Sequence, residues 1–190
     1  MSLSTQKATS ERYAEANAPL TALLDTVPAD RWDRPSPCEE WVARDVVRHL
    51  IQTQRDFLTG RGFAFGGDVD ADVDADPASA WRTHARAVGD LLARPEVAAT
   101  EYDGYFGPTT VGHTVGQFYI PDMVVHRWDI ASAVDADPTL TDDELDRTEA
   151  SIDSWGEAMY TAGICKPAVV PPAGASRQTV LLARMGRRAW

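Results

Sequence analysis

The segment Asp122-Met-Val-Val-His-Arg-Trp-Asp-Ile-Ala131 is strongly apolar, yet it carries a histidine and two aspartates. It lies within a helical stretch predicted over residues 116–134. Pro121 is expected either to bend this helix or to mark its true start. Asp122 lies four residues before His126, a spacing that puts both side chains on one helix face with Cβ atoms about 5–6 Å apart. Such a pair can bind one metal ion from a single helix.

A second histidine, His49, lies in another apolar helical stretch, Val46-Val-Arg-His-Leu-Ile51. A neighbouring helix can therefore supply a third ligand and complete a two-histidine, one-carboxylate site with open positions for water or substrate. The residues alone leave a plainer alternative open. An Asp-x-x-x-His pair is often a surface ion pair or a helix cap, and a histidine on an apolar face is usually a hydrogen-bonded core residue.

Apolar residues recur at helical spacing elsewhere in the chain. They predict further helices over residues 10–27, 41–58, 77–94 and 141–161. Asp76 and Pro77 form an N-cap signal, and Thr141-Asp-Asp-Glu144 forms a capping box. In the tail that starts at Gly163, a last short helix is expected to pack onto the body through four apolar residues, Val180, Leu181, Leu182 and Met185.

Two segments break the helical pattern. Residues 59–76 hold four glycines and five aspartates, the last of which is the N-cap Asp76. This composition predicts a mobile surface loop near an active-site mouth, or else a solvated linker without a role. Residues 101–111 are short and interrupted by glycine, which favours an extended segment or hairpin. The chain is therefore expected to be all-α, with one domain over residues 1–190. Its architecture is expected to be a four-helix bundle with an additional helix, a short extended segment and a C-terminal tail.

Composition excludes several classes of protein. The 190 residues include 18 Lys and Arg against 29 Asp and Glu, a formal net charge of -11. This balance argues against binding to nucleic acid or to an anionic membrane surface. There is no apolar stretch of membrane-spanning length, no apolar segment at the start that is typical of a secretion signal, and no disulfide framework in two cysteines. We expect a cytoplasmic protein with a small-molecule substrate, and a homodimer is compatible with a small bundle.

Two blocks of sequence together resemble a known family. The first is Pro35-Ser-Pro-Cys-Glu-Glu-Trp-Val-Ala-Arg-Asp-Val-Val-Arg-His-Leu50, and the second is the segment that begins at Asp122. In this order and at this distance they resemble the signature blocks of the DinB-like metal-binding proteins of actinobacteria. The most similar group is the mycothiol-dependent maleylpyruvate isomerases. The tail around Leu181-Leu-Ala-Arg-Met-Gly-Arg187 is also similar to that group.

The resemblance implies a DinB-like four-helix bundle with a divalent metal, Zn, Ni or Fe, in its core. Residue by residue, the ligands of the family correspond to His49, Asp122 and His126, although the best-known members have glutamate where this chain has Asp122. The resemblance also implies mycothiol as a cofactor and a transferase or isomerase reaction on a small electrophile.

Other functions remain open from the sequence. The chain could be a non-catalytic metal-binding or small-ligand-binding module of a stress response. It could also be a metal-free hydrolase or lyase that uses Asp122 and His126 as an acid/base pair. We recognise no Ser/His/Asp or Cys/His arrangement, so the nucleophile is expected to come from the cofactor.

Other candidate residues are weaker. Cys38 is a soft ligand or nucleophile by chemistry, but the family pattern leaves it outside the ligand set and favours a buried packing role. Cys165 is expected to be incidental. Asp129 follows His126 by three residues and can either orient it or pair with an arginine on the helix surface.

The same two roles are open for Asp45, one turn before His49, with Arg44 or Arg48 as its ion-pair partner. His113 should not share the site, because it lies thirteen residues before His126, about 19 Å along a continuous helix. His84, between Arg82 and Arg86, is expected at the surface.

Overall fold

The computed structural model describes residues 7–161 and 165–190. It is mostly helical and contains one small two-stranded sheet, so the all-α class is confirmed. The expectations for the first six residues and for the start of the tail at Gly163 lie outside the described residues.

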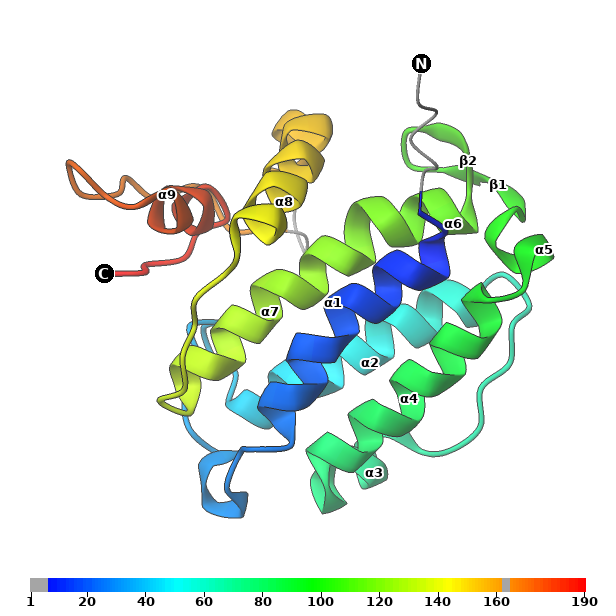
Figure 1. The fold of residues 1–190 in the computed structure, drawn as a ribbon, viewed down its shortest axis with the longest axis horizontal. Coiled ribbons are helices and arrows are strands. Elements are labelled where there is room, and N and C mark those ends of the chain that lie inside the picture. The colour runs from blue at the N-terminus through cyan, green and yellow to red at the C-terminus, as the bar shows by residue number, and fades with distance from the viewer. Residues whose placement is uncertain (1–6, 162–164) are drawn as a thin grey trace.

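Four long helices surround the larger apolar core. They are α1 (Thr9–Leu24), α2 (Ala43–Thr59), α4 (Pro77–Leu92) and α7 (Ile120–Ala133). Figure 1 shows α1 running along α7 and α4, with α2 behind it. Helices α1 and α2 each pack against both α4 and α7, so each helix has two neighbours. Each helix also contributes a completely buried side chain to the space between them, namely Leu20, Leu50, Trp81 and Met123.

The helix starts follow the capping chemistry of the sequence. The carboxylate of Asp76 accepts from the Ser79 N–H at 3.0 Å, and Pro77 occupies the first turn of α4, as predicted. The capping box at Thr141 and Glu144 is confirmed as the start of α8 (Asp142–Trp155). This helix ends before residue 161, because Gly156 adopts a positive φ of 52° and a 3-10 turn, η3 (Gly156–Tyr160), follows.

The expectation of an irregular loop over residues 59–76 is wrong for its second half. A short helix, α3 (Val69–Ala75), lies there. The carboxylate of Asp68 accepts from two N–H groups of its first turn, and Val73 is completely buried, so one cap and one apolar contact are enough to order it. The predicted start of the preceding helix is also corrected, because α2 begins at Ala43.

The segment before α7 explains the position of Pro121. A short helix, α6 (Val111–Thr114), leads into a π-helical turn, η2 (Val115–Tyr119), and α7 begins directly afterwards. Pro121 therefore lies at the second residue of α7, directly after the π-helical turn. It marks the point where regular α-helix resumes, within a stretch that is already helical from Val111 onward.

Helix α7 also borders a second apolar cluster. Val125 and Trp128 pack there with Ile152 of α8 and Leu181 of α9 (Arg177–Arg184). Twelve of the fourteen residues of α7 are therefore buried. The expected packing of the tail helix holds for Leu181, Leu182 and Met185, but Val180 is 40% exposed and is corrected to a surface residue.

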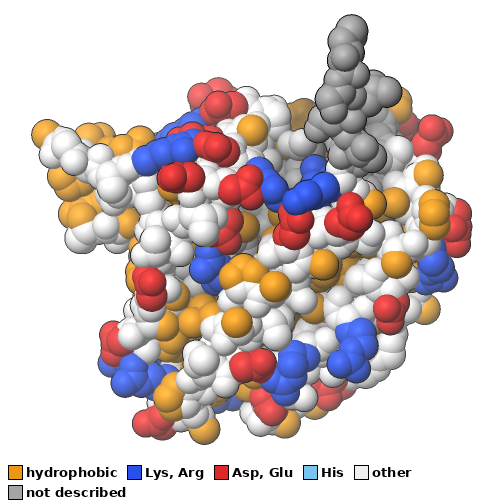
Figure 2. Space-filling model, in the orientation of Figure 1, with side chains coloured by type: hydrophobic (Ala, Val, Ile, Leu, Met, Phe, Trp, Pro, Cys, Tyr) orange, Lys and Arg blue, Asp and Glu red, His pale blue; other side chains and the backbone are white. Residues whose placement is uncertain are grey.

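The remaining elements are short. The predicted hairpin is confirmed as β1 (Glu101–Gly104) paired antiparallel with β2 (Gly107–Thr110). Two further turns of helix, η1 (Ala29–Arg31) and α5 (Pro95–Ala98), complete the described elements. Within the described residues, no helix combines the length and the apolar character needed to cross a membrane. Acidic and basic side chains are interspersed on the face seen in Figure 2.

The surface position expected for His84 is wrong. Its side chain is 5% exposed, and its Nε2 lies 3.0 Å from Oε1 of Gln54, which also accepts from the Tyr13 hydroxyl at 2.8 Å. Trp81 precedes His84 by three residues on α4, so helical spacing places both on the inner face. The flanking arginines lie on the other sides of the helix. Burial, with a smaller contribution from Arg55, lowers the pKa of His84 to about 3.

The buried His84 predicts a loss of stability in mild acid. The unfolded chain binds a proton at His84 below its ordinary pKa of about 6.5, whereas the folded chain does not until about pH 3. The free energy of unfolding should therefore fall by about 2 kcal/mol from this residue between pH 7 and pH 5. Urea unfolding of the wild type and His84→Gln at both pH values tests this. An unchanged pH dependence in the variant would contradict it.

Candidate metal centre

A tight loop before α2 prepares one side of the site. The Ser36 N–H donates to the Trp41 carbonyl at 2.9 Å, and the Trp41 N–H donates to the Cys38 carbonyl at 3.1 Å. The Ser36 hydroxyl also accepts from the Cys38 N–H at 3.1 Å. These bonds hold Cys38 and Trp41 directly before the helix that carries His49. The rings of Trp41 and His49 lie 4.9 Å apart, so the indole covers one side of the imidazole.

The structure brings together the three residues predicted as ligands. Nε2 of His126 lies 3.3 Å from Oδ1 of Asp122, and Nε2 of His49 lies 3.8 Å from Oδ2 of the same carboxylate. One ligand atom from each residue falls within 4.8 Å of those of the other two. Asp122 and His126 come from successive turns of α7, and His49 comes from the neighbouring α2. We call these three residues the ligand cluster.

The ligand cluster has an open and a closed side. The side chains of His49 and Asp122 are 28% and 32% exposed, whereas that of His126 is only 7% exposed. Small molecules can therefore approach the two outer residues, while His126 is held from within the protein.

Asp129 fixes the inner ring nitrogen of His126. Its Oδ2 lies 2.9 Å from Nδ1 of His126, and its carboxylate is completely buried. Because an ionised carboxylate only accepts, the proton of this hydrogen bond lies on Nδ1, and Nε2 is left to face the ligand cluster. The orienting role left open for Asp129 is therefore the observed one.

Arg187 neutralises the buried carboxylate from the far end of the chain. Its Nη2 donates to Asp129 Oδ2 at 2.8 Å, and its Nε donates to Oδ1 at 3.0 Å. The Arg187 side chain is 12% exposed, so the pair is shielded from water. Sequence reasoning missed this residue, because 58 residues separate it from its partner.

The packing role expected for Cys38 is also corrected. Its Sγ donates to Asp129 Oδ2 at 3.2 Å and lies 4.0 Å from Nδ1 of His126 and 3.7 Å from Nη2 of Arg187. A Cys/His arrangement thus exists although none was recognised in the sequence. Cys38 and His126 are 88 residues apart in the chain, so only the fold brings the thiol and the imidazole together.

Cys38, His126 and Asp129 form a second set with metal-ligating atoms. A cation is disfavoured there, because Asp129 already faces the Arg187 guanidinium and the Nδ1 of His126 carries a proton. No guanidinium faces Asp122 in the ligand cluster among the described residues, and Nε2 of His126 is not engaged by Asp129. The donor atoms of the ligand cluster are therefore the better candidates for holding a metal ion.

The charges of the cluster are strongly coupled. Burial alone would lower the pKa of His126, but Asp122 and Asp129 outweigh it and raise that pKa well above its ordinary value. Burial would likewise raise the pKa of Asp122, but His126 and His49 together lower it. Burial lowers the pKa of His49, and Asp122 offsets this only in part. Near neutral pH, His49 is thus a neutral imidazole and Asp122 a carboxylate.

The other candidates lie outside the cluster. The Asp45 carboxylate pairs with Arg48 and accepts from the Val42 N–H at 3.0 Å, so it caps α2 and does not orient His49. His113 is exposed on α6 and, as expected, does not share the site. Cys165 is half-buried beside the second apolar cluster, and both it and Cys38 are free thiols.

The comparison with family models decides the relationship. The model of the mycothiol maleylpyruvate isomerase N-terminal domain matches residues 13–131, which include the whole ligand cluster. The match covers more than half of the chain. The chain belongs to this family. The resemblance predicted from the two sequence blocks is thereby confirmed, and the chain is related to proteins of mycothiol chemistry.

Curated relatives come from Mycobacterium tuberculosis. The uncharacterized protein Rv0738 is 27% identical over 156 residues, which are 74% of this chain and 77% of the relative. The uncharacterized protein Rv0036c is 29% identical over 136 residues, 60% of this chain and 52% of the relative. No solved structure matches the chain. The region matched by the mycothiol maleylpyruvate isomerase domain ends at residue 131, so Arg187 reaches the site from outside it.

The buried pair predicts a large effect of removing Arg187. Arg187→Gln leaves the Asp129 carboxylate buried without its cation, which should lower the free energy of unfolding by about 3–5 kcal/mol. The double variant Asp129→Asn/Arg187→Gln should lose clearly less stability than the sum of the losses in the two single variants. Removing both charged partners leaves no unpaired charge in the interior. Denaturant unfolding of the four proteins measures this coupling. Additive losses would show that the pair is not coupled.

Proposed function

We propose that the chain binds one divalent metal ion through His49, Asp122 and His126. The supporting observation is the orientation of His126, whose Nδ1–H is held by Asp129 while Nε2 faces Asp122 and His49. Metal-binding histidines are usually oriented in this way by a carboxylate. Ligand atoms about 2.0–2.2 Å from a tetrahedral ion lie about 3.3–3.6 Å apart. The 3.3 Å between Nε2 of His126 and Oδ1 of Asp122 falls in that range, and the 3.8 Å between Nε2 of His49 and Oδ2 of Asp122 lies slightly above it.

The protonation states also suit a metal site. A ligating histidine must be neutral, and a ligating carboxylate must be ionised. Burial favours the neutral form of His49, and the neighbouring histidines favour the ionised form of Asp122. The proton on Nε2 of His126 is the one that a cation would replace. Zn, Ni and Fe all accept two imidazoles and one carboxylate.

We further propose that α1, α2, α4 and α7 form a DinB-like four-helix bundle and that residues 1–190 act as one domain. The closed ring of contacts among these helices supports the bundle. Support for one domain comes from α7, which contributes to the apolar clusters on both of its sides.

The proposed reaction is a transfer or isomerisation that depends on a low-molecular-weight thiol, mycothiol, and acts on a small electrophile in the cytoplasm. Two neutral histidines and one carboxylate leave a divalent ion with a net positive charge, which lowers the pKa of a bound thiol. The protein itself orients His126 through Asp129, shields one side of His49 with Trp41, and leaves the outer side of the cluster open. Three protein ligands also leave coordination positions for a thiol, unlike a closed structural site.

The first test of the proposed function concerns metal content. Purified wild-type protein should hold about one divalent metal ion per chain, and His49→Ala and His126→Ala should each lose it. Helix content should persist in both variants, because the helices are held by apolar cores outside the cluster. Elemental analysis together with circular dichroism measures both properties. His113→Ala is the matched control, since it removes an exposed histidine and should keep the metal.

Two results would overturn the proposal. One is the absence of metal from the wild type, with no uptake of Zn²⁺, Ni²⁺ or Fe²⁺. The other is loss of helix content on removal of the metal, which would indicate a structural ion.

The second prediction concerns the thiol. The metal-loaded protein should accelerate conjugation of mycothiol with a small electrophile such as monochlorobimane, followed by fluorescence. The His126→Ala variant and the wild type stripped of metal should show only the uncatalysed rate. Glutathione and cysteine serve as comparison thiols. Equal conjugation rates with and without metal would contradict the proposed thiol-dependent reaction. They would not contradict metal binding, which the elemental analysis tests separately.

A further inference from the structure

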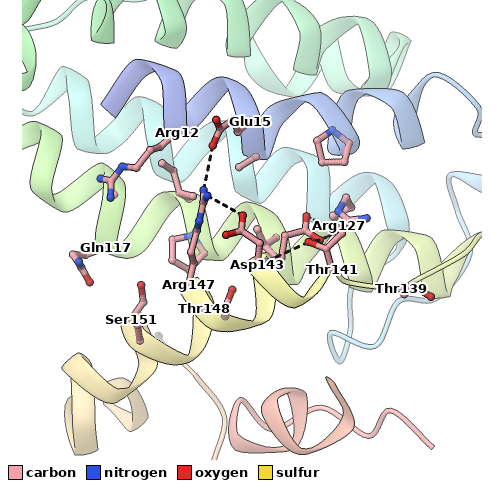
Figure 3. Close-up of a pocket in the computed structure, with 18 residues that line it drawn as sticks. Arg12, Glu15, Gln117, Arg127, Thr139, Thr141, Asp143, Arg147, Thr148 and Ser151 are labelled. Carbon is pink, nitrogen blue, oxygen red and sulfur yellow. Dashed lines mark hydrogen bonds and ion pairs between the residues drawn. The ribbon is translucent and has the colours of Figure 1, made fainter. Parts of the chain in front are cut away.

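A cavity lies away from the ligand cluster. It has a volume of about 420 Å³ and is lined by residues of α1, α7 with the preceding π-helical turn, and α8. Figure 3 shows Arg147 of α8 reaching toward Glu15 of α1, with Arg12 and Gln117 to one side. Ile120, Val124 and Arg127 of α7 line it. At about 100° per residue, these three positions lie on the opposite side of α7 from Asp122 and His126. The cavity is therefore distinct from the candidate metal centre.

The charges around this cavity are paired with one exception. Arg147 pairs with Glu15 and Asp143, as the dashed lines in Figure 3 show. Arg127 pairs with Glu144 through Nη2 at 2.7 Å. The guanidinium of Arg12 forms no ion pair or hydrogen bond with any of the described residues, and its Nε is buried without a partner. Among the residues that the structure describes, Arg12 is thus the one cation lining this cavity without an ionic partner.

A buried hydroxyl group in the same cavity also lacks a partner. Thr148 of α8 is 1% exposed, and its Oγ1 has no hydrogen bond within the described parts of the chain. Burying a hydroxyl without a partner costs free energy, so such groups are usually bonded to protein, water or ligand. The Thr148 hydroxyl and the Arg12 guanidinium are therefore two candidate donor groups for a ligand in this cavity.

The backbone makes room for Arg12. A Cβ at Gly116 would collide with Nη2 of the Arg12 guanidinium, so a larger residue there would force this flexible side chain out of its present position. Gly116 belongs to the π-helical turn η2, and such turns inside helices are frequent at functional sites. The free arginine is thus built into the packing of α1 against α7.

We propose that this cavity binds a small organic carboxylate with an apolar body. Arg12 supplies the charge and a planar pair of donors that matches a carboxylate, and Thr148 supplies a further donor. The body of the ligand packs on Ala16, Pro19 and Val124. The volume lies within the range of small-molecule sites.

Binding of benzoate measured by calorimetry tests the proposal. The wild type is first stripped of metal with EDTA, so that the carboxylate cannot bind an ion in the ligand cluster. Benzoate should bind with a dissociation constant in about the millimolar range, and neutral benzamide should bind at least about tenfold more weakly. Absence of benzoate binding, or equal binding of benzamide, would overturn the proposal.

Three variants assign the site. Arg12→Gln should weaken benzoate about tenfold or more, since it removes a charge-assisted bond. Gly116→Ala keeps the charge but displaces the guanidinium, and it should weaken binding as well. Thr148→Val removes the hydroxyl and should weaken binding without lowering the melting temperature, because the lost group had no protein partner.

Controls separate this cavity from other effects. Arg82→Gln removes an arginine that pairs with Asp25 elsewhere on the surface, and it should bind benzoate as the wild type does. His126→Ala should also retain binding, because its side chain lies on the opposite side of α7. Unchanged affinity in Arg12→Gln or in Thr148→Val, or loss of binding in His126→Ala, would place the carboxylate elsewhere and contradict the assignment.

Discussion

The ionised carboxylate of Asp129, which is completely inaccessible to water, is the constraint on which the site depends. Moving such a charge out of water costs several kcal/mol unless donors surround it. Here one donor, His126, lies on the same helix, and two come from distant parts of the chain: Cys38 in the loop before α2 and Arg187 in the tail. Satisfying one carboxylate therefore fixes the loop and the tail against α7. The orientation of the His126 ring follows from the same set of bonds.

Helix α7 can carry these charges because it is packed on nearly every side. Apolar side chains join it to the four-helix core and to α8 and α9, so its polar groups must find partners within the protein. Asp129 pairs with Arg187, and Arg127 pairs with Glu144. Asp122 and His126 face each other across one turn, where their outer atoms remain available to a ligand. Because the outer atoms of Asp122 and His126 lie on an otherwise buried helix and remain available to a ligand, they are the physical basis for proposing a metal ion there.

The sequence could predict those features that depend on local spacing. The separation of four residues between Asp122 and His126 is enough to place them on one face, and the capping residues of α4 and α8 mark the starts of those helices. The partnership with His49 depends on the packing of α2 against α7. The residues alone offered it as one possibility, and the resemblance to a family favoured it. His84 was misplaced because its charged neighbours outweighed its spacing from Trp81, although that spacing predicts the inner face.

Arg187 shows why the rest could not be predicted. No periodicity links residues 58 positions apart. The tail segment that ends at Arg187 resembles the family, but that resemblance gave this arginine no partner. Arg187 also lies beyond residue 131, where the match to the family ends. Arg187 donates hydrogen bonds to Asp129, and Asp129 orients His126. A substitution in the tail therefore alters the electrostatics of the candidate metal centre without replacing a ligand. Relatives that share the matched region can therefore differ in their sites through residues outside it.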